Sequence, residues 1–362
     1  MKRVAIAAGG TGGHFYPGLV VAKALKARGW EPLLIVRSGD PALAVIEGAG
    51  LAALPVDLRG LPRRPGPELF TFARKLASSL GLLSRALRSF QPDLALGMGG
   101  YLTFPLIFAA RRRGIARAVH ESNAVLGLAN AASLRLGARL FWGLPPAKSA
   151  AGGTLAGTPI RPELWRRRDA AASRRALGLA PDLTTLLVFG GSQGASGLNA
   201  ALPEALKALP DVQVLHLAGA GKSDAVRGAY RSAGVCADVR DYLEDMAGAY
   251  GAADLVVCRS GAGTLAELAA QRAPALLVPY PHAAALHQDA NARVLERAGA
   301  AAVLQENALA GGLGGVLKDL LKSDGAVKKR QTMADAYTRL GLPPAETTTD
   351  DFVDALEKMC GS

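Results

Sequence analysis

The chain has 362 residues, half of them hydrophobic, with a formal charge of +12 at pH 7 and a pI of about 9.9. This length predicts about two domains, and the charge predicts anionic partners such as phosphorylated ligands or an anionic membrane. The basic clusters carry no nucleic-acid-binding signature, so no nucleic-acid partner is expected.

The absence of membrane-span and signal-peptide patterns, together with the spacing of the cysteines, narrows the class of protein further. No run reaches the roughly 20 apolar residues of a membrane span, and the apolar run after Met1 is too short for a signal-peptide core. The three cysteines have neither metal nor disulfide spacing, which indicates a reducing cytoplasm. We therefore expect a soluble or peripheral protein.

The first half alternates short apolar strands with helices, a pattern typical of a doubly wound parallel sheet. We expect strands at residues 4–8, 32–36, 93–96 and 116–120, and helices at 16–28, 41–48 and 104–112.

Residues 68–90 form an amphipathic helix by the three- and four-residue spacing of their apolar positions. The ordinary interpretation is a helix with an apolar stripe against the core. Because the region 63–90 is also rich in Arg and Lys, a second interpretation is a surface resting on an anionic membrane. The core-facing and the membrane-facing interpretations can both hold if part of the apolar set, such as Phe70, Leu82 and Phe90, points outward.

A Gly- and Pro-containing stretch at 152–165 predicts an interdomain connection, after which the pattern restarts. The expected elements are a helix at 170–177, strands at 185–189, 212–217, 255–258 and 275–278, and a terminal helix at 350–359.

Two glycine-rich turns follow strands, at residues 9–14 (GGTGGH) and 190–195 (GGSQGA). A strand, a glycine turn and a helix present backbone N–H groups that bind phosphates; the alternative is a plain tight turn. Arg37 stands where a dinucleotide site needs an acidic residue, which disfavours NAD and leaves NADP open. Neither turn ends in the Gly-Lys-Ser/Thr of a P-loop.

Ligands of open α/β sheets bind beyond the carboxyl ends of the strands. There His14 is a candidate general base, since a helix N-terminus favours its neutral form, with a structural role as the alternative. Glu121 could belong to a site, or it could cap a helix or pair with a nearby Arg. Arg161 suits phosphate, while Glu267 could accept from a ribose diol or cap its helix. The imidazole and amide at 287–288 suit sugar hydroxyls.

Eight motifs occur in order: GGTGGH, GMGGY, HESN, GTPIR, GGSQGA, DYLEDM, CRSGAGTLAE and VPYPHAAALHQDANA. Together, over essentially the whole chain, they resemble the MurG family, the peripheral-membrane glycosyltransferases that move GlcNAc from UDP-GlcNAc to lipid I in bacterial peptidoglycan synthesis. Departures from the family pattern occur at Gly18, Gly263 and His287, and the last puts the detail of the sugar contacts in doubt.

The resemblance implies a GT-B fold, with two Rossmann-like doubly wound domains facing a cleft, and an inverting transfer without metal or cofactor. It implies an acceptor- and membrane-binding domain at 1–160, a UDP-GlcNAc-binding domain at 161–341, and a terminal helical segment at 342–362 that returns to the first domain. The protein would lie on the cytoplasmic face of the plasma membrane, with cell-wall synthesis and division proteins as partners.

The resemblance also implies residue roles. His14 is the leading base and Glu121 the second. The residues implied to contact UDP-GlcNAc are Thr11, Gly12, Gly13, Asn123, Arg161, Ser192, Gln193, Leu243, Met246, Ala262, Gly263, Thr264, Glu267, His287 and Gln288. The acceptor diphosphate would meet Gly10, Gly13, Gly99, Gly100 and Tyr101.

Other functions remain open from the sequence. The same fold suits a different glycolipid glycosyltransferase or a UDP-GlcNAc 2-epimerase, although an epimerase would have no use for the basic amphipathic region. A non-catalytic nucleotide-sugar sensor would bind UDP-GlcNAc without releasing UDP.

Overall fold

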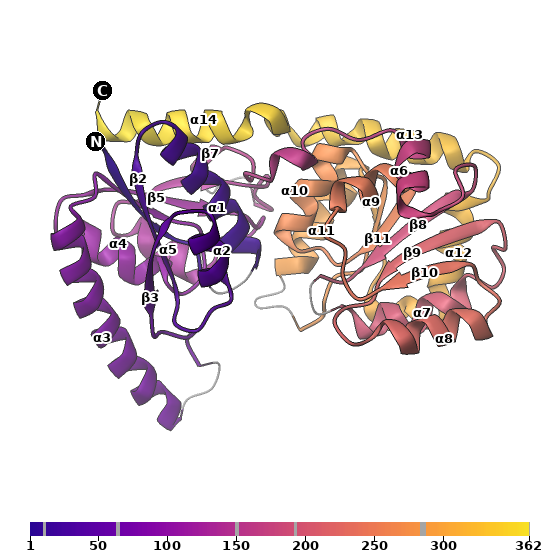
Figure 1. The fold of residues 1–362 in the computed structure, drawn as a ribbon, viewed down its shortest axis with the longest axis horizontal. Helices are drawn as coiled ribbons and strands as arrows, with labels where there is room; N and C mark the ends of the chain where they lie inside the picture. The colour runs from indigo at the N-terminus through magenta and orange to yellow at the C-terminus, as the bar shows by residue number, and fades with distance from the viewer. Residues whose placement is uncertain (10–11, 63–65, 149–151, 192–193, 283–286, 362) are drawn as a thin grey trace. The chain divides into compact units, whose positions relative to one another are not determined.

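The computed structural model describes residues 1–362 except 10–11, 63–65, 149–151, 192–193, 283–286 and 362. The chain forms two compact units, Met1–Arg161 with Leu342–Ser362, and Pro162–Gly341 (Figure 1). Each unit is built on one parallel sheet, which confirms the predicted doubly wound α/β class.

The sheet of the first unit has seven strands in the order β3-β2-β1-β4-β5-β6-β7. They are β1 (Arg3–Ala7), β2 (Glu31–Arg37), β3 (Ala52–Val56), β4 (Leu94–Gly97), β5 (Ala116–Glu121), β6 (Arg139–Trp142) and β7 (Thr154–Leu155).

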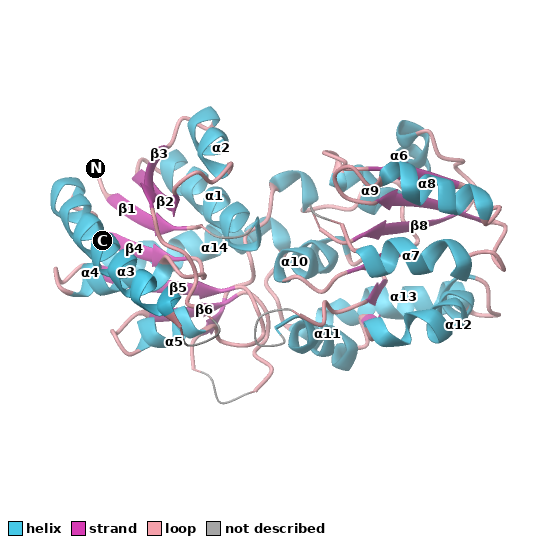
Figure 2. Ribbon diagram, turned by 90° about the horizontal axis from the view of Figure 1, so that it is seen from below, coloured by secondary structure: helices cyan, strands magenta, loops and turns pink. Residues whose placement is uncertain are grey.

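Helices cover both faces of this sheet (Figure 2). They are α1 (Gly12–Ala27), α2 (Ala42–Gly48), α3 (Pro67–Phe90), α4 (Thr103–Arg111), α5 (Leu128–Leu134) and α14 (Ala345–Glu357). Phe15, Ile46 and Phe352 place α1, α2 and α14 in one core, while Leu83 and Leu106 place α3 and α4 in the other.

The helix α1 begins at Gly12, four residues before the predicted start. His14 therefore lies in its first turn, and Pro17 lies inside the helix. The sequence pattern also does not predict β3, β6, β7, β10 and β13. Four of these are the outer strands of their sheets. β7 and β13 have two and three residues, β10 is largely polar, and β3 contains a proline, which sheets tolerate at an edge.

The core interpretation of residues 68–90 applies to the C-terminal half of α3. Of its described residues only Ser79, Leu83 and Leu87 are buried, all in that half. The condition under which both interpretations hold, an outward position of Phe70, Leu82 and Phe90, is met by Phe70, which is 79% exposed, whereas Leu82 and Phe90 are half-buried. In the described part of the chain, no helix is long and apolar enough to cross a membrane.

The helix α14 is held to α1 by a cluster of charges around Arg28. Its guanidinium pairs with Asp354, with Asp350 at 2.8 Å and with Glu357 at 3.1 Å. The hydrogen bond to Asp354 and the two further carboxylates raise the pKa of Arg28. The predicted terminal helix is thus confirmed, and it packs on the first unit through Phe352, Val353 and Leu356.

The sheet of the second unit has six strands in the order β10-β9-β8-β11-β12-β13. They are β8 (Thr184–Phe189), β9 (Val212–Leu217), β10 (Ala237–Arg240), β11 (Leu255–Cys258), β12 (Ala275–Leu277) and β13 (Ala301–Val303). The helices are α6 (Ala170–Leu177), α7 (Ser196–Ala205), α8 (Ser223–Ser232), α9 (Met246–Ala252), α10 (Ala262–Gln271), α11 (His287–Ala298), α12 (Leu309–Leu321) and α13 (Ala326–Ala336).

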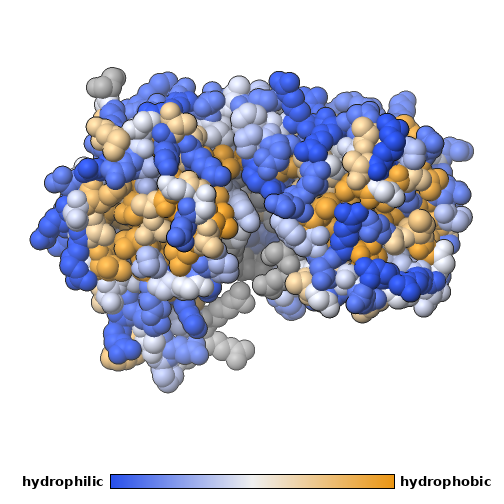
Figure 3. Space-filling view, in the orientation of Figure 1, coloured by the Kyte–Doolittle hydropathy of each residue, from blue (hydrophilic) through white to orange (hydrophobic). Residues whose placement is uncertain are grey.

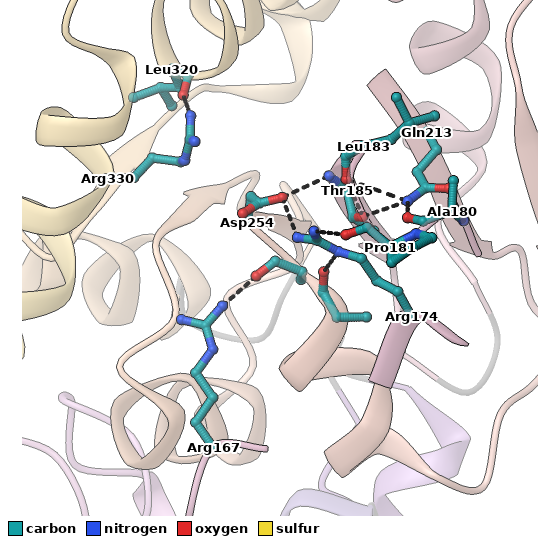
Figure 4. A network of polar contacts seen from close by, with 12 residues as sticks. Arg167, Arg174, Ala180, Pro181, Leu183, Thr185, Gln213, Asp254, Leu320 and Arg330 are labelled. Carbon is teal, nitrogen blue, oxygen red and sulfur yellow. Dashed lines mark hydrogen bonds and ion pairs between the residues drawn. The ribbon is translucent and has the colours of Figure 1, made fainter. Parts of the chain in front are cut away.

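A buried arginine joins the amino ends of β8 and β11 to α6 (Figure 4). Arg174 pairs with Asp254 at 2.7 Å and donates to the carbonyls of Ala252 and Pro181. The same Asp254 oxygen accepts from the backbone N–H of Thr185 at 2.8 Å. Because the Arg174 side chain is only 10% exposed, its charge depends on these acceptors.

Replacing Arg174 with Ala should lower the free energy of unfolding by roughly 2–4 kcal/mol, because a partly buried carboxylate and two carbonyls lose their donor. The neighbouring Arg175 is exposed, so Arg175→Ala should change stability by less than about 0.5 kcal/mol. Urea unfolding of both variants measures the difference. Equal stabilities would show that the Arg174 network contributes little.

Candidate active site

In the first unit, two glycine-containing loops leave the sheet side by side. The parallel pairing of β1 with β4 aligns Ala7 with Gly97. The loops that follow these strands therefore begin at the same edge, as expected for ligand-binding loops of an open α/β sheet. The described parts of the loops are Gly9, Gly12–His14 and Gly97–Tyr101.

The imidazole of His14 lies against the backbone of Gly99 and Gly100. A Cβ on Gly99 would be 2.8 Å from Cδ2 of His14, and a Cβ on Gly100 would be 3.3 Å from Nδ1. Both glycines have positive φ, +97° and +74°. Only glycine combines this backbone with so close an approach, so the GMGGY motif makes the space that His14 occupies.

Thr103 fixes the shape of the second loop from beneath. Its hydroxyl donates to the carbonyl of Gly99 at 2.8 Å and accepts from the Gly99 N–H at 3.1 Å. The side chain is fully buried beside Gly97, where a Cβ would lie 2.2 Å from Cγ2 of Thr103. This residue has no role in the sequence-based assignment, although it stands four residues after Gly99.

Glu121, the second candidate base, is 2% exposed at the end of β5. Oε1 accepts from the backbone and side-chain N–H groups of Asn123, and Oε2 accepts from Gly127 N–H and from Nδ2 of Asn130. These four donors direct both oxygens into the loop 121–130. The arrangement favours a structural role, because a general base needs a lone pair directed at its substrate.

His120 connects the same loop to the segment that leaves the unit. Its Nε2 lies 2.8 Å from the carbonyl of Gly157, which can only accept, so this nitrogen carries the proton. Nδ1 then accepts from the hydroxyl of Ser122 at 3.3 Å. Complete burial lowers the pKa of His120, and its ring lies 5.4 Å from that of Phe352 on α14.

Two further predicted residues lie near α1. The guanidinium of Arg161 lies over the ring of Tyr16, 5.9 Å from its centroid, in the turn after His14. Tyr101 lies beside Gly60, where a Cβ would be 3.8 Å from Cδ1 of Tyr101. Burial raises the pKa of Tyr101, while the charges of Arg37 and Arg59 oppose that rise and Asp40 adds to it.

In the second unit, α7 and α10 both begin at the carboxyl edge of the sheet. β8 and β11 are neighbours, with Phe189 aligned with Cys258, so the loop before each helix starts at the same level. The N-cap residues are Ala195 for α7 and Gly261 for α10, and neither has a side chain that caps its helix. Ala262, Gly263 and Thr264 make the first turn of α10 and carry the backbone N–H groups that an anion could use.

Glu267 lies one turn further along α10 and is half-buried. One of its oxygens, Oε2, accepts from the hydroxyl of Tyr250 on α9 at 2.9 Å. Tyr250 is fully buried, and burial together with the Glu267 charge raises its pKa well above the usual range. The phenol therefore stays a donor and orients the carboxylate.

Met246 begins α9, where Asp245 caps the helix, and Leu243 is half-buried just before it.

His287 and Gln288 begin α11, and the loop around them is tied to α10. The side-chain oxygen Oε1 of Gln288 accepts from the Tyr280 N–H at 3.0 Å, and the backbone carbonyl of Gln288 accepts from the Ser260 hydroxyl at 2.7 Å. Buried Asn291 donates to the carbonyl of Ser260 at 3.1 Å. The carbonyl oxygen of the Gln288 side chain is thus engaged by the loop, which leaves its NH2 group as the part suited to a sugar hydroxyl.

The structure thus brings His14 together with Gly99 and Gly100 in the first unit. In the second unit it ties Gln288 to Ser260, which stands just before the first turn of α10, and Glu267 to Tyr250. Four predicted residues, Gly10, Thr11, Ser192 and Gln193, lie outside the described residues. Among the residues described, no three His, Cys, Asp or Glu side chains are grouped to hold a metal ion. Of the supporting residues, Asn291 belongs to the VPYPHAAALHQDANA motif, whereas Thr103, Asn130 and Tyr250 lie outside the eight motifs.

Comparison with known proteins places this arrangement in a family. The N-terminal domain of glycosyltransferase family 28 matches residues 4–141, and the C-terminal domain of the same family matches residues 185–343. A UDP-N-acetylglucosamine–N-acetylmuramyl-(pentapeptide) pyrophosphoryl-undecaprenol N-acetylglucosamine transferase of Elusimicrobium minutum is 37% identical, covering 99% of this chain and all of the relative. The Halorhodospira halophila protein of that description is 41% identical over 95% of this chain and 96% of its own length.

A solved structure agrees with these relatives. The crystal structure of Acinetobacter baumannii MurG superposes with a TM-score of 0.80 at 29% identity, covering 99% of this chain and all of that one. Two doubly wound units with family 28 domains define a GT-B glycosyltransferase. The chain belongs to the MurG family of N-acetylglucosaminyltransferases.

The geometry around Glu121 generates a prediction. Glu121→Gln should lower the free energy of unfolding by roughly 2–4 kcal/mol, because an amide NH2 would face donors that now point at a carboxylate oxygen. The control is Glu47→Gln on α2, at an exposed position, with an expected change below about 0.5 kcal/mol. A Glu121→Gln variant of normal stability whose kcat falls by roughly 10²-fold or more would instead identify Glu121 as the base.

Proposed function

We propose that this chain transfers GlcNAc from UDP-GlcNAc to the C4 hydroxyl of MurNAc in undecaprenyl-diphospho-MurNAc-pentapeptide (lipid I), forming lipid II. The observation that carries the proposal is the similarity, over 99% of this chain, to proteins described as UDP-N-acetylglucosamine–N-acetylmuramyl-(pentapeptide) pyrophosphoryl-undecaprenol N-acetylglucosamine transferases. It is supported by the described motif residues, which lie at the carboxyl edges of the two sheets. The first unit would bind the acceptor and the second the nucleotide sugar.

The second unit has groups suited to a nucleoside diphosphate sugar. The uncapped turn at Ala262–Thr264 offers backbone N–H groups and a helix dipole to the diphosphate. Glu267, oriented by Tyr250, would accept from the ribose hydroxyls. Gln288 and His287 would contact the GlcNAc hydroxyls. Negative charge that develops on the leaving diphosphate is stabilised by such preorganised donors.

The first unit offers the base. In the transfer, the C4 hydroxyl attacks C1 of GlcNAc on the face opposite UDP, the bond from C1 to the diphosphate oxygen breaks, and His14 takes the hydroxyl proton. The first turn of α1 favours the neutral imidazole that a base needs. The backbone of Gly99 and Gly100 holds the ring in place, and the neighbouring turns would receive the acceptor diphosphate.

The test is UDP release from UDP-GlcNAc with and without a lipid I analogue, with the lipid product identified by mass. We expect release only with acceptor and a product heavier by one GlcNAc. His14→Ala should keep UDP binding while turnover falls by roughly 10²–10⁴-fold. Near-normal turnover would remove His14 from the role. Acceptor-independent release of UDP would favour a 2-epimerase, and binding without release would favour a sensor.

We also propose that the protein associates peripherally with an anionic membrane, at the cytoplasmic face of the plasma membrane, through the N-terminal half of α3. Leu61, Leu69 and Phe70 are 56%, 46% and 79% exposed, and Arg74 is exposed one turn beyond. Hydrophilic residues cover most of this projecting end in Figure 3. A few apolar side chains among basic ones are typical of interfacial binding to anionic lipid.

Phe70→Asp should weaken binding to vesicles that contain anionic lipid by about tenfold, since it removes an apolar contact and adds a repelled charge. Val327→Asp is the matched control, because Val327 is 73% exposed on α13 of the other unit and receives the same charge change. Vesicle co-sedimentation measures both. Equal weakening in the two variants would mean that net charge alone, and not α3, governs the association.

A further inference from the structure

Arg259 is a buried cation beneath the carboxyl edge of the second sheet. It directly follows β11 and is 7% exposed. Its Nη1 donates to the carbonyls of Val278 and Pro279, each at 3.2 Å, and its guanidinium lies 5.4 Å from the ring centroid of Tyr280. One side chain thus joins the loop after β11 to the segment after β12.

Glu306 brings a third strand end to this cation. It begins the short 3₁₀ helix η3 (Glu306–Ala308) after β13, and its Oε2 lies 2.7 Å from Nη1 of Arg259. Within the part of the chain that the structure describes, that oxygen is buried and has no hydrogen-bond partner besides this ion pair. The attraction is therefore between charges, and it is strong because both groups are largely removed from water.

The other oxygen of Glu306 lies against α7, the helix that follows the glycine turn 190–195. A Cβ on Gly197 would be 2.1 Å from Oε1 and 3.0 Å from Cδ of Glu306. Gly197 is the second residue of α7, whose N-terminus has no side-chain cap. A carboxylate on the first turn of a helix interacts favourably with its dipole, and glycine at 197 leaves the space for it.

From these contacts we propose that Glu306 is a positioning residue for the nucleotide-diphosphate site. It holds the Arg259 guanidinium and the first turn of α7 in fixed relation, and so joins the loops that follow β8, β11, β12 and β13. These loops carry the α7 and α10 turns and Gln288, whose backbone and side chain are tied to Ser260 and Tyr280. The inference rests on the proposed function only in taking UDP-GlcNAc as the ligand.

Charge and position of Glu306 can be separated by substitution. Glu306→Gln keeps the shape and removes the charge, whereas Gly197→Ala keeps the charge and displaces the carboxylate. Since a positioning role needs both, each variant should weaken UDP binding by about tenfold in calorimetry, with a similar rise in the KM for UDP-GlcNAc. The control is Gly228→Ala on α8, where a Cβ meets nothing within 4 Å, and its binding should match the wild type.

The double variant Gly197→Ala/Glu306→Ala tests whether the two residues act together. If Gly197 serves only to accommodate Glu306, the double variant should bind UDP no more weakly than Glu306→Ala alone. Additive weakening would overturn the coupling. Should Glu306→Ala fail to fold, the comparison of Glu306→Gln with Gly197→Ala still decides whether both charge and position are needed.

Two other results would overturn the proposal. Variants that melt at lower temperature but bind UDP within twofold of the wild type would show a role in stability alone. Tighter UDP binding by Glu306→Gln would show that the carboxylate competes with the diphosphate for the α7 turn. A wild-type protein that does not bind UDP would refute the proposed function as well, a result distinct from unchanged binding in the variants.

Discussion

Parallel strand pairing is the constraint on which the sites depend. Every described strand pair in both sheets is parallel, so the carboxyl ends in one unit point to one edge. Gly9 and Gly99 are distant in sequence, as are Ala195 and Gly261. Each pair lies at the same edge of its sheet because parallel pairing aligns the ends of the strands that precede the two residues. The sheets could tolerate many side-chain exchanges, but a reversed strand would remove a loop from its site.

The glycines at these edges act chiefly by leaving space. His14 lies on Gly99 and Gly100, and the Glu306 carboxylate lies on Gly197, so closely that a Cβ on Gly99 or Gly197 would displace the neighbouring side chain. In both places the neighbour is a group of chemical consequence. Glycine turns are commonly discussed as anion-binding backbone, but here they also seat an imidazole and a carboxylate.

The sequence predicts much of this molecule and fails in specific places. Strongly apolar central strands and the amphipathic helices α3 and α14 follow from periodicity. β3 and β10 do not, because the proline inside β3 argues against a strand and β10 has no apolar run, and both are tolerated at the edge of a sheet. The motifs do not distinguish Glu121, whose two oxygens accept four hydrogen bonds from its own loop, from Glu267, which accepts one from the hydroxyl of Tyr250, because the path of a loop around a carboxylate is not visible in the pattern of residues.

In two motifs, buried polar residues directly precede residues that are less buried. In HESN, His120 and Glu121 are buried and Asn123 is only partly so; in CRSGAG, Arg259 and Ser260 are buried, as is Ala262, whereas Gly261 and Gly263 are not. Each motif therefore joins a buried polar anchor to a turn with partly exposed backbone. A buried charge is costly unless it is compensated, and Arg259 finds its compensation at the ends of neighbouring strands. Under the proposed function, a charged group that touches no substrate would in this way influence how the turns present their N–H groups.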